Sequence, residues 1–283
     1  MAVLKLTIPQ DWNDLTKRNI KFISKLWFDW TSNIEEYKQL EHANKTKEAK
    51  ALNFKILKQC TKLFMNLTNV DRWWRWRLQY LFWKQTDTQL NQCIKDLLFI
   101  REDINLTKNN FPYLCLLTQK WYAPINGFSD FKAAEYAFAD SCFLRYWETK
   151  EISHLNNLIS ILYRKKEKNN NPSSLDYTGS FREKFNRYNI EARSKKLWCI
   201  SLATKTAILL WYLGSRKAYQ KKFPLIFTNS VKNKANKYGW ISVFRELAGK
   251  DVVKIPLIEK QDLTLLLSSL DMDISESLIA SRK

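Results

Sequence analysis

Glycine is scarce in this chain of 283 residues. Only five glycines occur, under 2% of the chain, whereas about 7% is usual in globular proteins. Neither of the glycine-rich phosphate-binding motifs, G-x-G-x-x-G and G-x-x-x-x-G-K-[ST], is present. Sandwiches and barrels place glycine at many of their tight turns. The scarcity of glycine therefore argues against nucleotide-binding loops of recognisable sequence and against a fold rich in β-hairpins.

Metal-binding and nucleophilic motifs are missing as well. No two of the five cysteines lie closer than 22 residues, so no C-x-x-C occurs. The two histidines, His42 and His154, have no companions at metal-ligand spacing, and nothing local pairs a nucleophile with a base. We therefore expect no metal, no cofactor and no catalytic residue, hence a protein that is not an enzyme. The cysteines are expected to be buried, reduced thiols.

Long apolar runs are also absent. The most apolar stretch, Ala207 to Leu213, is far shorter than the roughly 18 residues that span a bilayer. The segment from Met1 to Pro9 lacks the apolar run of a signal peptide. These features predict a soluble protein made inside the cell, with no membrane span.

Helical periodicity and aromatic side chains are what the sequence has in abundance. Aromatic residues make up 14% of the chain, with twelve tryptophans, and apolar residues recur with a period near 3.6 from Asp11 to about Leu40. Further helices are expected over residues 51–67, 72–84, 88–98, 129–147, 153–163, 192–213, 240–247 and 261–281. We expect an all-α fold, an irregular helical bundle of two lobes, with at most a minor β element near 252–258.

A change of composition suggests the domain organisation. Residues 164–180 combine basic residues with three asparagines, a proline and serines, which is typical of a linker or exposed loop. We therefore predict an aromatic-rich helical domain over residues 1–163. A basic helical region with an amphipathic C-terminal tail would follow over residues 181–283.

The segment Asp71 to Trp83 interleaves arginines with aromatic residues. Its aromatic residues recur every three to four positions and would form one stripe on a helix. The members of this stripe are Trp73, Trp76, Tyr80 and Trp83. Such a stripe packs into a core while the arginines reach solvent, stacks on single-stranded bases or lies at a membrane interface. The regular period favours the core.

The net charge of +19 is concentrated in one segment. Residues 164–237 hold 18 lysines and arginines against 4 acidic residues, whereas residues 238–283 hold 6 against 7. A positive field of this kind favours a polyanion or an acidic protein surface as partner. A solvated helical face, or the composition of an AT-rich genome, is the alternative explanation. The candidate contacts are Arg182, Arg187, Arg193, Lys195, Lys196, Lys221 and Lys222.

Two stretches carry a resemblance to phage proteins. The opening Ile8-Pro-Gln-Asp-Trp12-Asn-Asp-Leu-Thr16, continuing to Ile20, resembles the P-x-x-W-x-E/D-L-T opening of several small tail and neck proteins of tailed bacteriophages. Residues 106–164, which include Leu106-Thr-Lys-Asn-Asn-Phe-Pro112, look like a group of proteins from phages and prophages of Bacteroidetes-type bacteria. Residues beyond Arg164 are not part of the resemblance. It implies a role in virion morphogenesis, with Trp12 anchoring the start of the chain.

The expected function is that of a non-enzymatic structural or assembly protein of a tailed bacteriophage, such as a head–tail connector, neck or tail component. It would form a homo-oligomer, bind other virion or assembly proteins and contact DNA through phosphates without sequence specificity. It would be made in the cytoplasm of the bacterial host and reside in the virion. The first alternative is a standalone, non-specific nucleic-acid-binding helical protein, and the second is a nucleic-acid enzyme with dispersed carboxylates.

Overall fold

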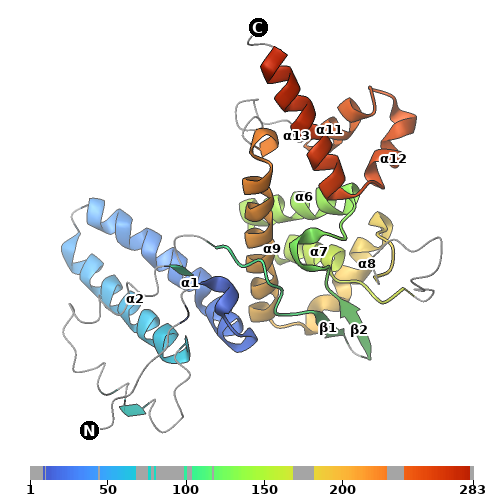
Figure 1. Ribbon diagram of the computed structural model, residues 1–283. Coiled ribbons are helices and arrows are strands. Elements are labelled where there is room, and N and C mark those ends of the chain that lie inside the picture. Colours follow the sequence, from blue (N-terminus) through green and yellow to red (C-terminus); the bar gives the residue numbers. More distant parts are fainter. Residues whose placement is uncertain are drawn as a thin grey trace. The chain divides into compact units, whose positions relative to one another are not determined.

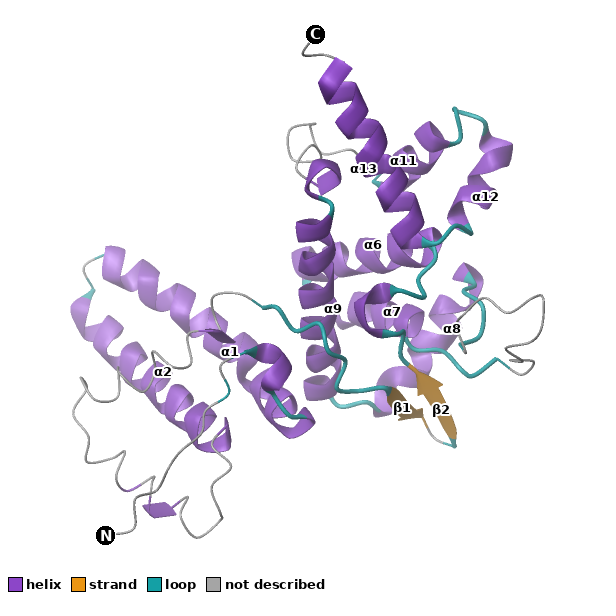
Figure 2. Cartoon of the chain, in the orientation of Figure 1, coloured by secondary structure: helices purple, strands orange, loops and turns teal. Residues whose placement is uncertain are grey.

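The structure is a computed structural model of residues 1–283. It describes residues 9, 11–43, 45–67, 76–77, 80, 99–100, 104–116, 118–167, 182–227 and 239–280. The described residues are 74% helical and contain a single two-stranded sheet (Figures 1 and 2). The predicted all-α class is therefore confirmed.

The chain forms two compact units, and their boundary differs from the predicted one. Unit 1 comprises residues 1–106 and 202–213, and unit 2 comprises residues 107–201 and 214–283. The chain before and after the expected linker at 164–180 belongs to the same unit, where Lys166 and Arg182 form an antiparallel bridge.

Unit 1 is built on a helical hairpin. Helices α1 (Lys17–His42) and α2 (Thr46–Leu67) pack against each other. They run antiparallel, because the Asn19 side chain near the start of α1 donates to the Asn66 carbonyl near the end of α2 at 3.1 Å. Apolar side chains spaced three to four residues apart form the buried face of the hairpin. Its buried members are Ile20, Ile23, Trp27, Cys60, Leu63 and Leu67.

The chain enters α1 through a short 3-10 helix, η1 (Trp12–Asp14). Asp11 caps η1 by accepting from the Asn13 amide, and Thr16 caps α1 by accepting from the Asn19 amide. The single helix expected from Asp11 is therefore two elements, each with its own capping residue.

Unit 2 contains the sheet, which is a β-hairpin. Strand β1 (Tyr113–Leu116) pairs antiparallel with β2 (Gln119–Tyr122). Tyr113 lies opposite Tyr122 and Cys115 opposite Lys120, so these four side chains share one face of the hairpin. The other face carries the buried Leu114, Leu116 and Trp121.

Two antiparallel helices follow the hairpin and organise the rest of unit 2. Helix α6 (Ala133–Thr149) turns into α7 (Ile152–Leu162) through Lys150, whose left-handed backbone (φ 59°) ends α6. Helix α9 (Leu202–Lys222) begins in unit 1 and continues into unit 2. The other elements of unit 2 are η2 (Asn126–Phe128), η3 (Arg187–Asn189), α8 (Ile190–Ser194), η4 (Lys195–Cys199), α11 (Trp240–Leu247), η5 (Val252–Lys254), α12 (Ile255–Glu259) and α13 (Leu263–Ala280).

The core of unit 2 is aromatic. Phe128 and Phe131 stack with their ring centroids 4.5 Å apart, and Tyr219 from α9 lies 5.7 Å from Phe128. A second cluster joins Ala133 and Ala137 on α6 to residues of α11 and α13. The C-terminal helices are thus anchored on α6, where apolar burial supplies the main stabilisation.

The strand character expected near 252–258 is wrong. These residues lie in η5 and α12, where Pro256 occupies the first turn of the helix. Proline is tolerated at that position because the amide it lacks has no partner within the helix. The observed strands, β1 and β2, lie elsewhere.

Candidate functional site

Arg182, predicted as a surface contact, is buried in unit 2 at 2% exposure. Its guanidinium donates to Glu135 and Asp130, both at 2.9 Å, and to the Leu162 carbonyl at 2.8 Å. The second Glu135 oxygen accepts from the buried Arg164 at 2.8 Å. Burial lowers the pKa of Arg164, while the neighbouring Glu135 acts to raise it. Glu135 thus joins two internal guanidiniums.

Two further arginines of the basic segment are also paired. Arg193 is buried and forms an ion pair with Glu183. Arg216 on α9 donates to Asp140 on α6 at 2.5 Å, and the Trp240 indole donates to the other Asp140 oxygen at 3.1 Å. Both oxygens of this buried carboxylate are therefore hydrogen-bonded, as buried charges require.

These pairs correct the predicted roles of Arg182 and Arg193. Neither residue can contact a polyanion, because its charge is neutralised inside the fold. Three of the neutralising carboxylates, Asp130, Glu135 and Asp140, lie outside the basic segment 164–237. The charge count along the sequence therefore overstated the positive charge that this segment exposes.

The remaining predicted contacts, which are mostly lysines, are exposed. Arg187, Lys195 and Lys196 lie in the region of η3, α8 and η4, whereas Lys221 and Lys222 end α9. Helix α9 has 21 residues, and at about 1.5 Å per residue it is roughly 30 Å long. The exposed charges therefore fall into two groups, with Arg187, Lys195 and Lys196 in one and Lys221 and Lys222 in the other.

Residues 187–199 form one continuous helical run. Their backbone keeps right-handed helical angles at both junctions, between η3 and α8 and between α8 and η4. Residues three to four apart in such a run share a face. The outer face of the run consists of Tyr188, Glu191, Lys195 and Trp198, all of which are exposed. The opposite side buries Arg193, Ser194 and Leu197.

This run exposes two large aromatic side chains beside three cations. Tyr188 is 78% exposed and Trp198 is 75% exposed. We call Arg187, Tyr188, Lys195, Lys196 and Trp198 the aromatic–basic face. Exposed apolar surface with a polar rim is typical of interaction sites, so this face is the candidate site.

The polar contacts within the aromatic–basic face are local. The Arg187 guanidinium lies 5.2 Å from the centre of the Tyr188 ring and donates to its hydroxyl at 3.2 Å. Lys195 pairs with the exposed Glu191 at 2.9 Å, and this hydrogen bond lowers the pKa of Glu191. Such solvent-exposed pairs hold their partners weakly, so Lys195 can exchange Glu191 for another anion.

The β-hairpin, which lies beside this run, also exposes an aromatic ring with a neighbouring cation. Strand β1 lies beside η4. On the exposed face of the hairpin, the Lys120 ammonium lies 5.1 Å from the centre of the Tyr113 ring. Two neighbouring elements therefore each expose an aromatic ring with an adjacent cation.

The tryptophan-rich stripe does not have the predicted burial. Trp76 and Tyr80 are each 57% exposed, so the prediction that they are core residues is wrong. Trp73 and Trp83 lie outside the described residues. The period of the stripe indicates that its side chains share a helical face, but it does not determine whether that face meets the core.

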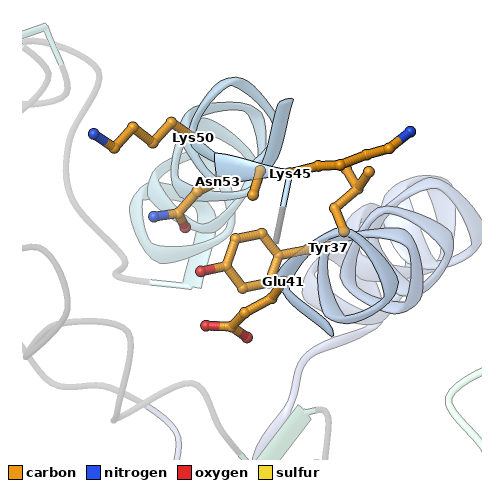
Figure 3. A pocket seen from close by; sticks show the side chains of 7 residues that line it. Tyr37, Glu41, Lys45, Lys50 and Asn53 are labelled. Carbon is orange, nitrogen blue, oxygen red and sulfur yellow. The ribbon is translucent and has the colours of Figure 1, made fainter. Parts of the chain in front are cut away.

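A pocket of about 270 Å³ lies at the turn between α1 and α2 (Figure 3). Tyr37 and Glu41 come from α1 and Asn53 from α2, while Lys45 and Lys50 extend away from each other. Ligand sites usually bring a few polar groups together on an apolar cavity. Because the charged groups of this pocket diverge, it is a weaker candidate than the aromatic–basic face.

Among the described residues, no three His, Cys, Asp or Glu side chains gather closely enough to hold a metal ion. None of the helices in the described ranges is long and apolar enough to cross a membrane. Comparisons with family models, with curated proteins and with solved structures find no match to this chain.

Two cysteines of unit 2, Cys142 and Cys199, differ in their accessibility to solvent. Burial raises the pKa of Cys142 to about 11, whereas Cys199, at the end of η4, is exposed. Because the thiolate is the reactive form, iodoacetamide at pH 8 should label Cys199 much faster than Cys142. Mass spectrometry of the labelled peptides measures both rates. Equal rates would contradict the partial burial of Cys142 on α6.

Proposed function

We propose that this protein is a non-enzymatic structural or assembly protein of a tailed bacteriophage and that it contacts nucleic acid without sequence specificity. The observation that carries the nucleic-acid contact is the contrast between the buried arginines of the basic segment and four of its lysines. The buried arginines are neutralised by carboxylates, whereas Lys195, Lys196, Lys221 and Lys222 are exposed. The particle context is supported by the resemblance of residues 8–20 and 106–164 to phage proteins.

Exposed lysines suit contacts with a phosphate backbone. An ammonium group on a long flexible stem acts as a mobile point charge. It neutralises a phosphate wherever the strand passes and reads no base. Such binding releases counterions, so its affinity falls steeply as salt is added.

Removing these lysines should flatten the salt dependence of duplex binding. We expect the quadruple change of Lys195, Lys196, Lys221 and Lys222 to serine to lower the slope of log K against log salt by up to about 3.6, since each phosphate contributes about 0.9. Folding should be unaffected because the four side chains are exposed. Fluorescence anisotropy with a labelled duplex at several salt concentrations measures the slope.

Two paired variants locate the contact. Serine at Lys195 and Lys196 tests the aromatic–basic face, and serine at Lys221 and Lys222 tests the end of α9. Serine at the exposed Lys21 and Lys25 of α1 removes the same charge elsewhere and serves as the control. A control that weakens binding as much as the other pairs would show that only the overall charge matters.

Particle composition tests the structural role. A neck, connector or tail component should co-purify with phage particles at a fixed copy number. If the protein enters particles but does not bind DNA at low salt, its exposed charge belongs to a protein interface. If it binds DNA but is absent from particles, it is a standalone nucleic-acid-binding protein. If it does neither, the proposal fails.

A further inference from the structure

The aromatic–basic face contains two exposed aromatic rings that a purely electrostatic contact does not require. Lysines alone suffice to bind a phosphate backbone, yet this face also exposes Tyr188 and Trp198 to solvent over about three quarters of their surface. Large aromatic side chains are highly buried on average in folded proteins. Two of them on the outer side of one helical run therefore call for a partner that uses their flat surfaces.

The spacing of the two rings matches an extended partner. Tyr188 and Trp198 are ten residues apart on a continuous helical run. With a rise of about 1.5 to 2.0 Å per residue, their backbones are roughly 15–20 Å apart. Lys195 lies between them on the same face, and Arg187 lies against the Tyr188 ring. Rings and cations thus follow one another along a line.

We propose that the aromatic–basic face binds single-stranded nucleic acid, with Tyr188 and Trp198 stacking on unpaired bases and Arg187, Lys195 and Lys196 contacting phosphates. This inference rests on the proposed nucleic-acid contact and names its substrate class. The flat faces of bases are covered by their neighbours in a duplex and become accessible in a single strand. Aromatic platforms between basic residues are the usual way in which proteins bind single strands without sequence preference.

The charge of the face favours a polyanion over an acidic or apolar protein surface of fixed shape. Its three cations are exposed, and Glu191 is the one acidic residue within the run 187–199. Glu191 is paired with Lys195 at 2.9 Å, so it competes with phosphate for that cation. Changing Glu191 to Gln should therefore strengthen binding of single and double strands alike, as a purely electrostatic effect.

The test compares two ligands and two classes of variant. The ligands are a labelled 20-nucleotide single strand of mixed sequence and the duplex of the same sequence, both at low salt. We expect the double change Tyr188→Ala and Trp198→Ala to weaken single-strand binding at least about tenfold and to leave duplex binding within about twofold. The double change Tyr188→Phe and Trp198→Phe keeps both rings and should retain most of the single-strand affinity.

Controls separate stacking from charge and from folding. Trp147→Ala removes a partly exposed tryptophan from α6, outside the aromatic–basic face, and should leave both affinities unchanged. The pair Lys195→Ser and Lys196→Ser should weaken binding to single strand and duplex together. Thermal melting should be unaffected by all of these surface changes except Trp147→Ala, because Trp147 stacks on Phe143 with ring centroids 5.8 Å apart.

The outcomes are distinguishable. Selective loss of single-strand binding in the alanine pair, with rescue by the phenylalanine pair, supports the inference. If the alanine pair binds both ligands as the wild type does while the lysine pair weakens both, the stacking inference is wrong and the proposed electrostatic contact stands. If the wild-type protein binds neither ligand at low salt, the inference and the proposed nucleic-acid contact fail together, and the face is assigned to a protein partner.

Discussion

Replacing Glu135 with alanine is expected to destabilise unit 2 by about 3–5 kcal/mol, the usual cost of breaking a buried ion pair. The change leaves Arg164 and Arg182 buried without the carboxylate that joins them. Asp130 remains as a partner for Arg182 only. For a domain of this size, we expect the melting temperature to fall by roughly 6–20 °C, as measured by differential scanning calorimetry.

A surface pair provides the control for Glu135. Lys132 and Asp262 lie 2.7 Å apart but are partly exposed. Lys132→Ala should therefore cost at most about 1 kcal/mol. If Glu135→Ala and Lys132→Ala lowered the melting temperature equally, the internal arginine pairs would not hold the fold as described.

Trp12→Ala is expected to destabilise unit 1 by about 3–5 kcal/mol, because it truncates a large core side chain. Trp12 is 1% exposed. Its ring meets Trp27 edge to face with centroids 5.9 Å apart, and its indole donates to the Phe99 carbonyl at 3.0 Å. Trp12 thus connects η1 to the middle of α1 and to a segment 87 residues later.

Hydrogen exchange localises this effect. Amides of α1 should exchange faster in Trp12→Ala than in the wild type, whereas those of α6 should be unchanged. Trp12→Phe keeps an aromatic ring and loses the indole hydrogen bond, so it should cost less than the alanine change. Unchanged exchange in α1 of the alanine variant would show that Trp12 does not anchor this helix.

The long helices were predictable from sequence because apolar residues recur along them with a period near 3.6. The helix expected over 51–67 is α2, and the helix expected over 153–163 is α7, each within a few residues. The β-hairpin was missed because its strands have only four residues each, too few for a period of two to be visible. The helix expected over 192–213 ends before Gly214, yet α9 continues through this residue, since glycine inside a helix costs only about 1 kcal/mol.

The candidate site was only partly predictable. The excess of basic residues pointed to the segment that carries the exposed lysines, but pairing with carboxylates up to 76 positions away is a tertiary effect that no local charge count contains. The sequence does hold a signal for the aromatic–basic face. Tyr188, Lys195 and Trp198 recur at helical spacing, while Leu197 and Arg193 point to the other side. Only the structure shows which of the two sides is exposed.

The salt dependence of nucleic-acid binding by the wild-type protein tests the central claim most directly. If the four exposed lysines neutralise phosphates, the affinity for a duplex should fall roughly 100-fold between about 50 mM and about 200 mM salt. The fall should become much smaller when Lys195, Lys196, Lys221 and Lys222 are changed to serine. A wild-type protein that does not bind at the lower salt concentration, or whose affinity does not change with salt, would contradict the account.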